Sequence, residues 1–375
     1  MSLILRLSTL CLLLAFVAMP LFASDTSLSV EKTLTLAPSE DNPRNSEGDF
    51  ISLSNGDILF IYTHFSGGSG DGDTAWLASR RSTDGGATWT QEDALVLENE
   101  GQRNIMSVSL LRLQNGTIAL FYLRKNGWND CRPLMRISTD EGESWGEPVE
   151  CIPEPVGYYV VNNSRIIQLK TGRLVIPAAI HGLHGSAFVE RGSAVCFLSD
   201  DEGKSWYRSE SELIAPEAAK SGFQEPGIVE LSDGSILMHL RNDLGVLYES
   251  RSTDGAMTWS EAEPTKLKTP VSPSSCMMIP GTERLLLLWN DHENIEEALA
   301  RKRTPLTLVL SDDGGRQWFG RRVIEDNPAG WYCYTAIRFT DSHVLLGYCA
   351  GDTRNSPGLA TTQISRIALS ELSAL

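Results

Sequence analysis

The feature that most constrains this chain is an eight-residue motif that occurs five times. Each copy begins with serine, has aspartate at its third position and ends with tryptophan, and the copies start at Ser82, Ser138, Ser199, Ser252 and Ser311. Successive copies begin 56, 61, 53 and 59 residues apart, and such a period is typical of repeat architectures. Glycines favour a tight turn, aspartate and hydroxyl side chains bind turn amides, and tryptophan packs against a neighbouring unit. We therefore predict that the acidic motif residues stabilise turns rather than act in catalysis or metal binding.

A second kind of hairpin alternates with the motif. Strand-like runs flank six turns, at 55–56, 115–116, 171–172, 233–234, 281–282 and 341–342. Each such hairpin and the adjoining motif hairpin supply four strands, the content of one propeller blade. The sixth unit has no motif, so we expect its third strand at 361–369 and its fourth strand from 29–36. The sequence therefore predicts an all-β, six-bladed β-propeller with four antiparallel strands per blade.

The first residues have the pattern of an export signal. Arg6 is the only charged residue before Asp25, an apolar run covers 10–17, and the small residue Ala23 follows Pro20. The apolar run is shorter than the roughly 20 residues that span a bilayer. We predict a signal peptide at 1–23, one propeller domain over 24–375, and a secreted or periplasmic location.

Charge and cysteine spacing limit the partners. The net charge of −16 argues against nucleic acid and anionic membranes, so an acidic substrate requires a local cluster of arginines. The cysteines after residue 23 show no metal-binding spacing, and their pairing is left open. We expect a monomer that uses no cofactor or metal and binds an acidic glycan.

In a propeller, the residues before the first strands, after the second strands and before the third strands meet on one rim. On this chain the rim is rich in arginines and carboxylates. The candidate site residues there are Arg44, Glu47, Asp71, Asp73, Asn104, Asn163, His181, Glu225, Arg241, Arg303 and Tyr334.

Three segments of this rim resemble the sialidases. The stretch from Glu225 to Arg241 is similar to the one that carries the catalytic glutamate of that family and, 16 residues later, an arginine of its substrate-binding triad. Arg303 precedes the motif at Ser311 as another triad arginine does, and Tyr334-Thr-Ala-Ile resembles the segment of the nucleophilic tyrosine. With the five motifs, the resemblance covers nearly the whole chain after residue 23. It implies a sialidase-like propeller.

The resemblance implies a retaining exo-glycoside hydrolase that releases terminal sialic acid or a related nonulosonic acid. Arginines bind the sugar carboxylate, and a neutral tyrosine nucleophile avoids its repulsion. Tyr334 then needs a base, which Glu225 supplies, because a phenol has a pKa of about 10. A further carboxylic acid must protonate the leaving oxygen, and Asp71 and Asp73 are both candidates. Arg44, Glu47, Asn104, Asn163 and His181 are expected to contact substrate.

The chain departs from the sialidase pattern near residue 44. Sialidases usually have an Arg-Ile-Pro motif before the first inner strand, but counting back from Gly56 places Ser46 or Glu47 there. We expect Arg44, slightly upstream, to reach the site. Glu47 is unusual for a pocket that binds carboxylates. Two alternatives therefore stay open: a hydrolase or lyase of another acidic sugar on the same propeller, and a non-catalytic propeller that binds glycans.

Overall fold

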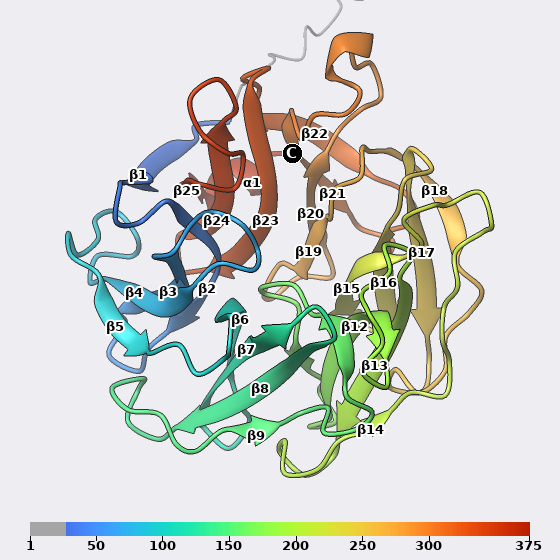
Figure 1. Cartoon of the computed structure of the whole chain (residues 1–375). Helices are drawn as coiled ribbons and strands as arrows, with labels where there is room; N and C mark the ends of the chain where they lie inside the picture. Colours follow the sequence, from blue (N-terminus) through green and yellow to red (C-terminus); the bar gives the residue numbers. More distant parts are fainter. Residues whose placement is uncertain (1–27) are drawn as a thin grey trace, which may run out of the picture.

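The computed structural model describes residues 28–375, whose regular secondary structure is almost entirely β-strand (Figure 1). The prediction of an all-β chain is confirmed. Helical structure in this range is limited to η1 (Glu297–Leu299) and α1 (Leu369–Ser373), and neither could cross a bilayer. The signal peptide predicted at 1–23 lies outside the described residues and stays a prediction.

The strands form five sheets. Four of the sheets have four strands, and one has nine. The first contains β2 (Arg44–Ser52), β3 (Ile58–Phe65), β4 (Ala75–Ser82) and β5 (Ala94–Leu97). The nine-stranded sheet contains β6 (Asn104–Arg112), β7 (Ile118–Gly127), β8 (Asp130–Ser138), β9 (Val149–Glu150), β10 (Gly157–Val160), β11 (Ile167–Gln168), β12 (Leu174–Leu183), β13 (Ser193–Ser199) and β14 (Tyr207–Arg208).

The remaining sheets complete the chain. One contains β15 (Gln224–Glu230), β16 (Ile236–Arg241), β17 (Val246–Ser252) and β18 (Glu263–Lys268). The next contains β19 (Ser275–Met278), β20 (Leu285–Asn290), β21 (Leu306–Ser311) and β22 (Phe319–Glu325). The last contains β23 (Gly330–Phe339), β24 (His343–Asp352), β25 (Thr362–Ala368) and, at its edge, β1 (Glu31–Leu36).

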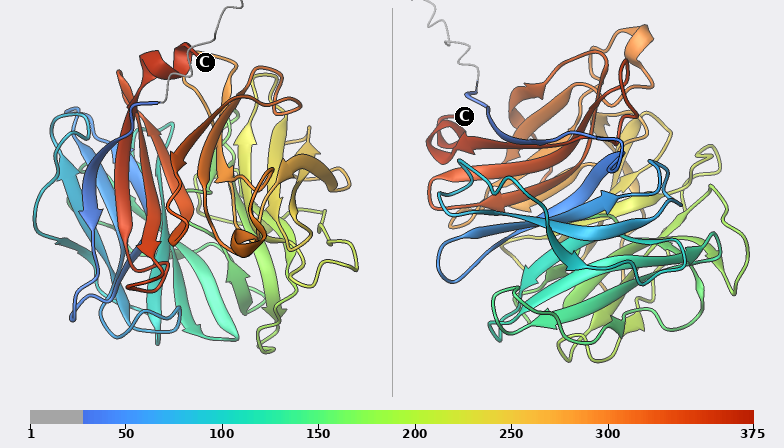
Figure 2. Two further views of the ribbon diagram at one scale, coloured as in Figure 1. Left: turned by 90° about the horizontal axis from the view of Figure 1, so that it is seen from above. Right: turned by 60° about the vertical axis from the view of Figure 1, so that its left-hand side comes forward.

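The two ends of the described chain meet in the last sheet. Strand β1 pairs antiparallel with β25, from Glu31 opposite Arg366 to Leu36 opposite Thr362, and Figure 2 shows the blue strand beside the red ones. These strands match the two expected at 29–36 and 361–369. The sheets surround a common centre (Figure 1), where β2 contacts β6 and β23, and β15 contacts β12 and β19.

The repeated motifs form turns after β4, β8, β13, β17 and β21. In the first copy Ser82 Oγ donates to Asp84 Oδ1 at 2.9 Å, while Thr88 donates its N–H to Oδ1 at 2.9 Å and its hydroxyl to Oδ2 at 2.6 Å. These bonds from Thr88 lower the pKa of Asp84 to about 2. The tryptophan of the third copy, Trp206, packs edge-on against Phe121 of β7. The motif therefore folds as the turn and packing unit that its residue types predict.

Candidate functional site

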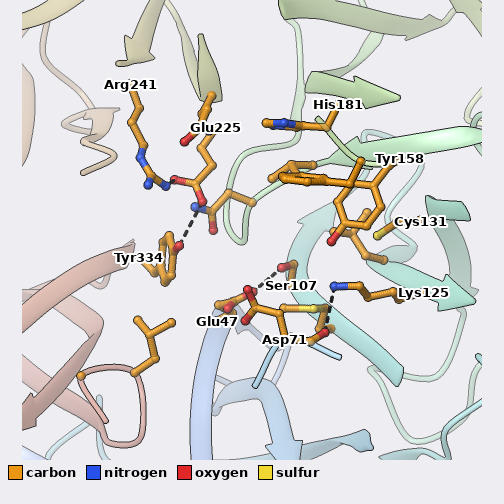
Figure 3. Close-up of a pocket in the computed structure, with 18 of the residues that line it drawn as sticks. Glu47, Asp71, Ser107, Lys125, Cys131, Tyr158, His181, Glu225, Arg241 and Tyr334 are labelled. Carbon is orange, nitrogen blue, oxygen red and sulfur yellow. Dashed lines mark hydrogen bonds and ion pairs between the residues drawn. The ribbon is translucent and has the colours of Figure 1, made fainter. Parts of the chain in front are cut away.

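A pocket of about 490 Å³ opens where the first strands of the sheets begin, at the opposite end from the motif turns. Figure 3 shows that its side chains converge from several sheets. Seven of the eleven sequence-predicted site residues line it: Glu47, Asp71, His181, Glu225, Arg241, Arg303 and Tyr334. These residues are spread over more than 280 positions of the sequence but share one cavity.

A common backbone irregularity carries several of these side chains into the pocket. Strands β2, β6, β15 and β23 each lose register with their neighbour over three residues. In each of the four strands, the first residue inside the irregular segment has a positive φ: Glu47 (56°), Ser107 (61°), Glu225 (45°) and Tyr334 (59°). This conformation costs a non-glycine residue about 1–3 kcal/mol and concentrates at functional sites. Four strands therefore aim a polar side chain at one cavity.

Tyr334 and Glu225 are in direct contact across the pocket (Figure 3). The Tyr334 hydroxyl donates to Glu225 Oε1 at 3.0 Å, and Arg241 Nη1 donates to the other oxygen of the same carboxylate. Burial opposes ionisation of Glu225, but the charges of Arg241 and Arg303 hold its pKa below the ordinary value. Burial and the Glu225 charge raise the pKa of Tyr334. The pair is thus a neutral phenol hydrogen-bonded to a carboxylate.

Two guanidinium groups on the same side of the pocket have N–H donors that make no hydrogen bond within the described residues. The guanidinium of Arg303 lies between the rings of Trp331, at 5.2 Å, and Tyr334, at 5.3 Å. Its Nε and Nη1, and the Nε of Arg241, are buried and have no hydrogen-bond partner among residues 28–375. Buried polar groups are normally hydrogen-bonded, so these donors suit an anionic ligand such as a carboxylate.

The guanidinium of Arg44 is hydrogen-bonded to carboxylates of the protein itself. It is 1% exposed and does not line the pocket. Its Nη2 donates to Glu47 Oε1 at 2.5 Å and its Nη1 to Asp71 Oδ1 at 2.6 Å, so one cation holds two carboxyl groups. Contact between Arg44 and substrate stays a prediction; in this structure both arms of the guanidinium face carboxylates.

Three other predicted residues lie behind the pocket wall. Asn104 Nδ2 donates to the carbonyls of Asp71 and Asp73, at 3.0 and 2.8 Å, and so holds the loop before β4. The carboxylate of Asp73 turns back within that loop, where it accepts from the N–H of Gly70 at 2.8 Å. Asn163 Nδ2 donates to two carbonyls of neighbouring strands. None of these three side chains lines the pocket.

Of the wall opposite Tyr334, only His181 was predicted. It contains Lys125 and an aromatic group in which Tyr158 stacks on Trp128 and Phe188 on His181. The ammonium of Lys125 lies 4.1 Å from the centre of the Trp128 ring and donates to the carbonyl of Asp71 at 2.9 Å. Burial lowers the pKa of Lys125. Besides His181, the position of Lys125 next to Arg124, after a predicted second strand, was the only sequence signal for this wall.

Metal ligation has no evident place in the described structure. No cluster of three or more His, Cys, Asp or Glu side chains between residues 28 and 375 is arranged to hold an ion. The six cysteines of this range are all free thiols.

Comparison with known proteins identifies one family and several similar proteins. A family model described as a BNR repeat-like domain matches residues 56–345. The anhydrosialidase of Macrobdella decora is 33% identical over 237 residues, which cover 57% of this chain and 29% of that protein. The sialidase of Micromonospora viridifaciens is 27% identical over 296 residues, covering 70% of this chain and 43% of that protein. This chain spans less than half the length of either curated relative.

Solved structures show the same fold. A leech intramolecular trans-sialidase complexed with 2,7-anhydro-Neu5Ac superposes with a TM-score of 0.71 at 17% identity. The match covers 93% of this chain and 71% of the leech chain.

Proposed function

Since this chain belongs to the BNR repeat-like family of the sialidase superfamily, we propose that it is a glycoside hydrolase that releases terminal sialic acid, or a related nonulosonic acid, from glycans. The observation that carries the proposal is the contact between Tyr334 and Glu225 beside two arginines with uncommitted donors. A neutral nucleophile next to a carboxylate-binding site suits a substrate whose anomeric carbon bears a carboxylate.

The proposed reaction retains configuration. Arg241 and Arg303 bind the sugar carboxylate, which places the anomeric carbon near Tyr334. As the glycosidic bond breaks, the Tyr334 oxygen attacks that carbon and its proton passes to Glu225, 3.0 Å away. Water then attacks the glycosyl–tyrosine intermediate, and Glu225 returns the proton to the departing phenolate. Two displacements at one carbon restore the original configuration.

A carboxylic acid must protonate the leaving oxygen in the first step. Of the two aspartates at the position that the sialidase resemblance implies, Asp71 lines the pocket and Asp73 does not. Of these two aspartates, Asp71 is therefore the candidate for the acid that protonates the leaving oxygen. Its side chain is half-exposed and is ion-paired with Arg44 at 2.6 Å.

We also propose that the five sheets are six blades of four strands in a single propeller. The nine-stranded sheet is joined between β8 and β10 by one parallel residue pair, Cys131 with Tyr158. Division at that pair leaves four strands before it. After it, β10 and β11 both pair with β12, and β13 and β14 follow, so each half has the content of one blade and one motif turn.

Substitution of the contact pair tests the proposed function. We expect Tyr334→Phe and Glu225→Gln each to lower kcat/KM on a fluorogenic sialoside by about 10²–10⁴-fold, because each removes a nucleophile or its base. Steady-state kinetics with wild type and both variants measures this, and NMR of the first-formed sugar anomer reports retention. Glu261→Gln, an exposed change on the motif-turn side, is the control. Wild type without turnover of any sialoside contradicts the proposal.

One observation favours a second candidate function. The pocket has two arginines and an additional carboxylate, Glu47, where sialidases usually present a third arginine. This arrangement suits a hydrolase or lyase of another acidic sugar. Turnover of uronic-acid glycans with no turnover of sialosides would select it. Glycan binding without any turnover would instead select a non-catalytic propeller.

A further inference from the structure

Lys125 is a buried cation in the wall of the pocket. Side chains alternate along β7, so that Arg124 contacts Glu150 away from the pocket, whereas Lys125 lines it. Lys125 is 1% exposed, and no carboxylate between residues 28 and 375 forms a salt bridge with it. Its ammonium lies instead against the rings of Trp128, at 4.1 Å, and Tyr158, at 5.1 Å. Because a lysine is almost never buried without an ion pair, this position indicates a role in the pocket.

The hydrogen bond of this ammonium goes to the loop that carries the candidate acid. Lys125 Nζ donates to the main-chain carbonyl of Asp71 at 2.9 Å (Figure 3), and the Asn104 amide donates to the same carbonyl at 3.0 Å. The next residue, Gly72, lies against the indole that the ammonium contacts, since a β-carbon there would be 3.6 Å from that ring. The main chain of Asp71 is therefore held from β6 and β7, while Arg44 of β2 holds its carboxylate.

The ammonium also acts on the carboxylate of Asp71 through its charge. Partial burial opposes ionisation of this carboxyl, but Arg44 and, after it, Lys125 and Arg303 hold its pKa below the ordinary value. Of these three cations, only Lys125 also donates a hydrogen bond to the main chain of Asp71 in the described structure. The titratable and charged groups that face Asp71 are Arg44 and Glu47 of β2, Lys125 of β7, Cys131 of β8, Tyr158 of β10 and Arg303 before β21.

We propose that Lys125 is a positioning residue for the acid step and fixes Asp71, the candidate acid, beside the leaving oxygen; this rests on the proposed hydrolase function. Lys125 itself transfers no proton. It holds the main chain of Asp71 while the carboxyl gives its proton to the glycosidic oxygen, the bond from that oxygen to the anomeric carbon breaks, and Tyr334 bonds to the carbon. Its positive charge then favours the carboxylate that takes a proton from the attacking water in the second step.

Substrates with different leaving groups test the assignment. We expect Lys125→Met, which keeps the length of the side chain but loses the charge and the donor, to lower kcat/KM on a sialyl-galactoside by about 10²-fold, because the acid is displaced. On an activated aryl sialoside the loss should be less than about threefold, because a good leaving group needs no proton. Lys125→Arg, which keeps a charge and a donor, should recover part of the galactoside activity.

Lys170→Met is the matched control. The Lys170 ammonium also donates to main-chain carbonyls that are distant in the sequence, those of Leu231 and Ser232 at 3.2 and 3.3 Å, but it lies away from the pocket. Thermal unfolding is measured for every variant, and if Lys125→Met does not fold, Lys125→Gln, which also loses the charge, takes its place. Equal losses on the two substrates in the Lys125 variant, or an equal difference between the substrates in Lys170→Met, overturn the inference.

Titration of Asp71 separates this inference from the proposed function. With ¹³C-labelled aspartate, NMR follows the carboxyl signal that is missing from Asp71→Asn. We expect the pKa of Asp71 to rise in Lys125→Met, because the carboxylate loses a nearby positive charge, and to keep its wild-type value in Lys170→Met. A pKa of Asp71 that is unchanged in Lys125→Met overturns the inference whether or not the protein hydrolyses sialosides. Wild type that turns over no sialoside, while the pKa rises in Lys125→Met, contradicts the proposed function alone.

Discussion

At the scale of single residues, Asn163 links two of the strands that form the pocket. Its amide donates to the carbonyl of Gly48 in β2 at 2.8 Å and to the carbonyl of Tyr334 in β23 at 3.0 Å. Asn163 is 1% exposed and lies behind the cavity, so it acts on substrate only through the backbone that it holds. The two bonds set the positions of Tyr334 and of the residue after Glu47.

We therefore expect Asn163→Ala to lower kcat about tenfold or more while KM changes less, because a small displacement of a nucleophile affects the reaction more than binding. Kinetics on a fluorogenic sialoside and thermal unfolding would be measured together. Gln114→Ala is the control, since Gln114 also donates to backbone carbonyls far away in the sequence, those of Leu169 and Lys170, but lies away from the pocket. Equal losses of kcat in both variants would show that Asn163 has only a structural role.

At the scale of elements, the motif turns are built for stability and lie away from the pocket. In the turn after β17, Asp254 Oδ1 accepts from the Ser252 hydroxyl at 2.8 Å and from the N–H groups of Met257 and Thr258, at 3.1 and 2.9 Å. The Thr258 hydroxyl donates to the other oxygen. One carboxylate thus organises the whole turn.

Asp254→Ala should lower the free energy of unfolding by about 1–2 kcal/mol, the scale of a few partly exposed hydrogen bonds, and leave kcat/KM unchanged. Urea unfolding and sialoside kinetics measure the two effects, with Glu261→Ala as the control on the same exposed side. A large loss of kcat/KM in Asp254→Ala, with the fold intact, would contradict the purely structural interpretation of the motif.

At the scale of the whole molecule, the fold depends on β1, the first described strand, because this strand pairs with the last sheet of the chain. β1 completes the sheet of β23, β24 and β25, more than 290 residues later in the sequence. Its last residue, Leu36, is 6% exposed in a cluster with Phe50 and Trp89, which belong to the first motif unit. The strand therefore ties the last sheet to the first.

Leu36→Ala should lower the free energy of unfolding by about 2–4 kcal/mol, as expected for a large-to-small change in a core. If closure of the ring stabilises the entire fold, far-ultraviolet circular dichroism and tryptophan fluorescence should report one coincident, shifted transition. Glu40→Ala, at an exposed position just after β1, is the control. An unfolding midpoint equal to that of wild type would mean that β1 lies at the edge of its sheet without stabilising the whole fold.

The sequence by itself determined much of this protein. The strand content, the motif turns and the pairing of β1 with β25 follow from local signals that repeat at a steady period, whereas the resemblance to sialidase segments singled out Glu225, Arg241, Arg303 and Tyr334 on the predicted rim. Turn chemistry acts within a few residues, and a regular repeat places equivalent positions on one rim. These predictions therefore did not require knowledge of side-chain packing.

Only the tertiary structure decided how the rim residues are used. The sequence placed Arg44 in the substrate site, but Glu47 and Asp71 from two different elements bind its guanidinium. The wall formed by Lys125 and Trp128 escaped prediction in the same way. Such choices depend on which charged and aromatic side chains meet across sheets and how deeply each is buried, and neither quantity is encoded in the spacing of a repeat.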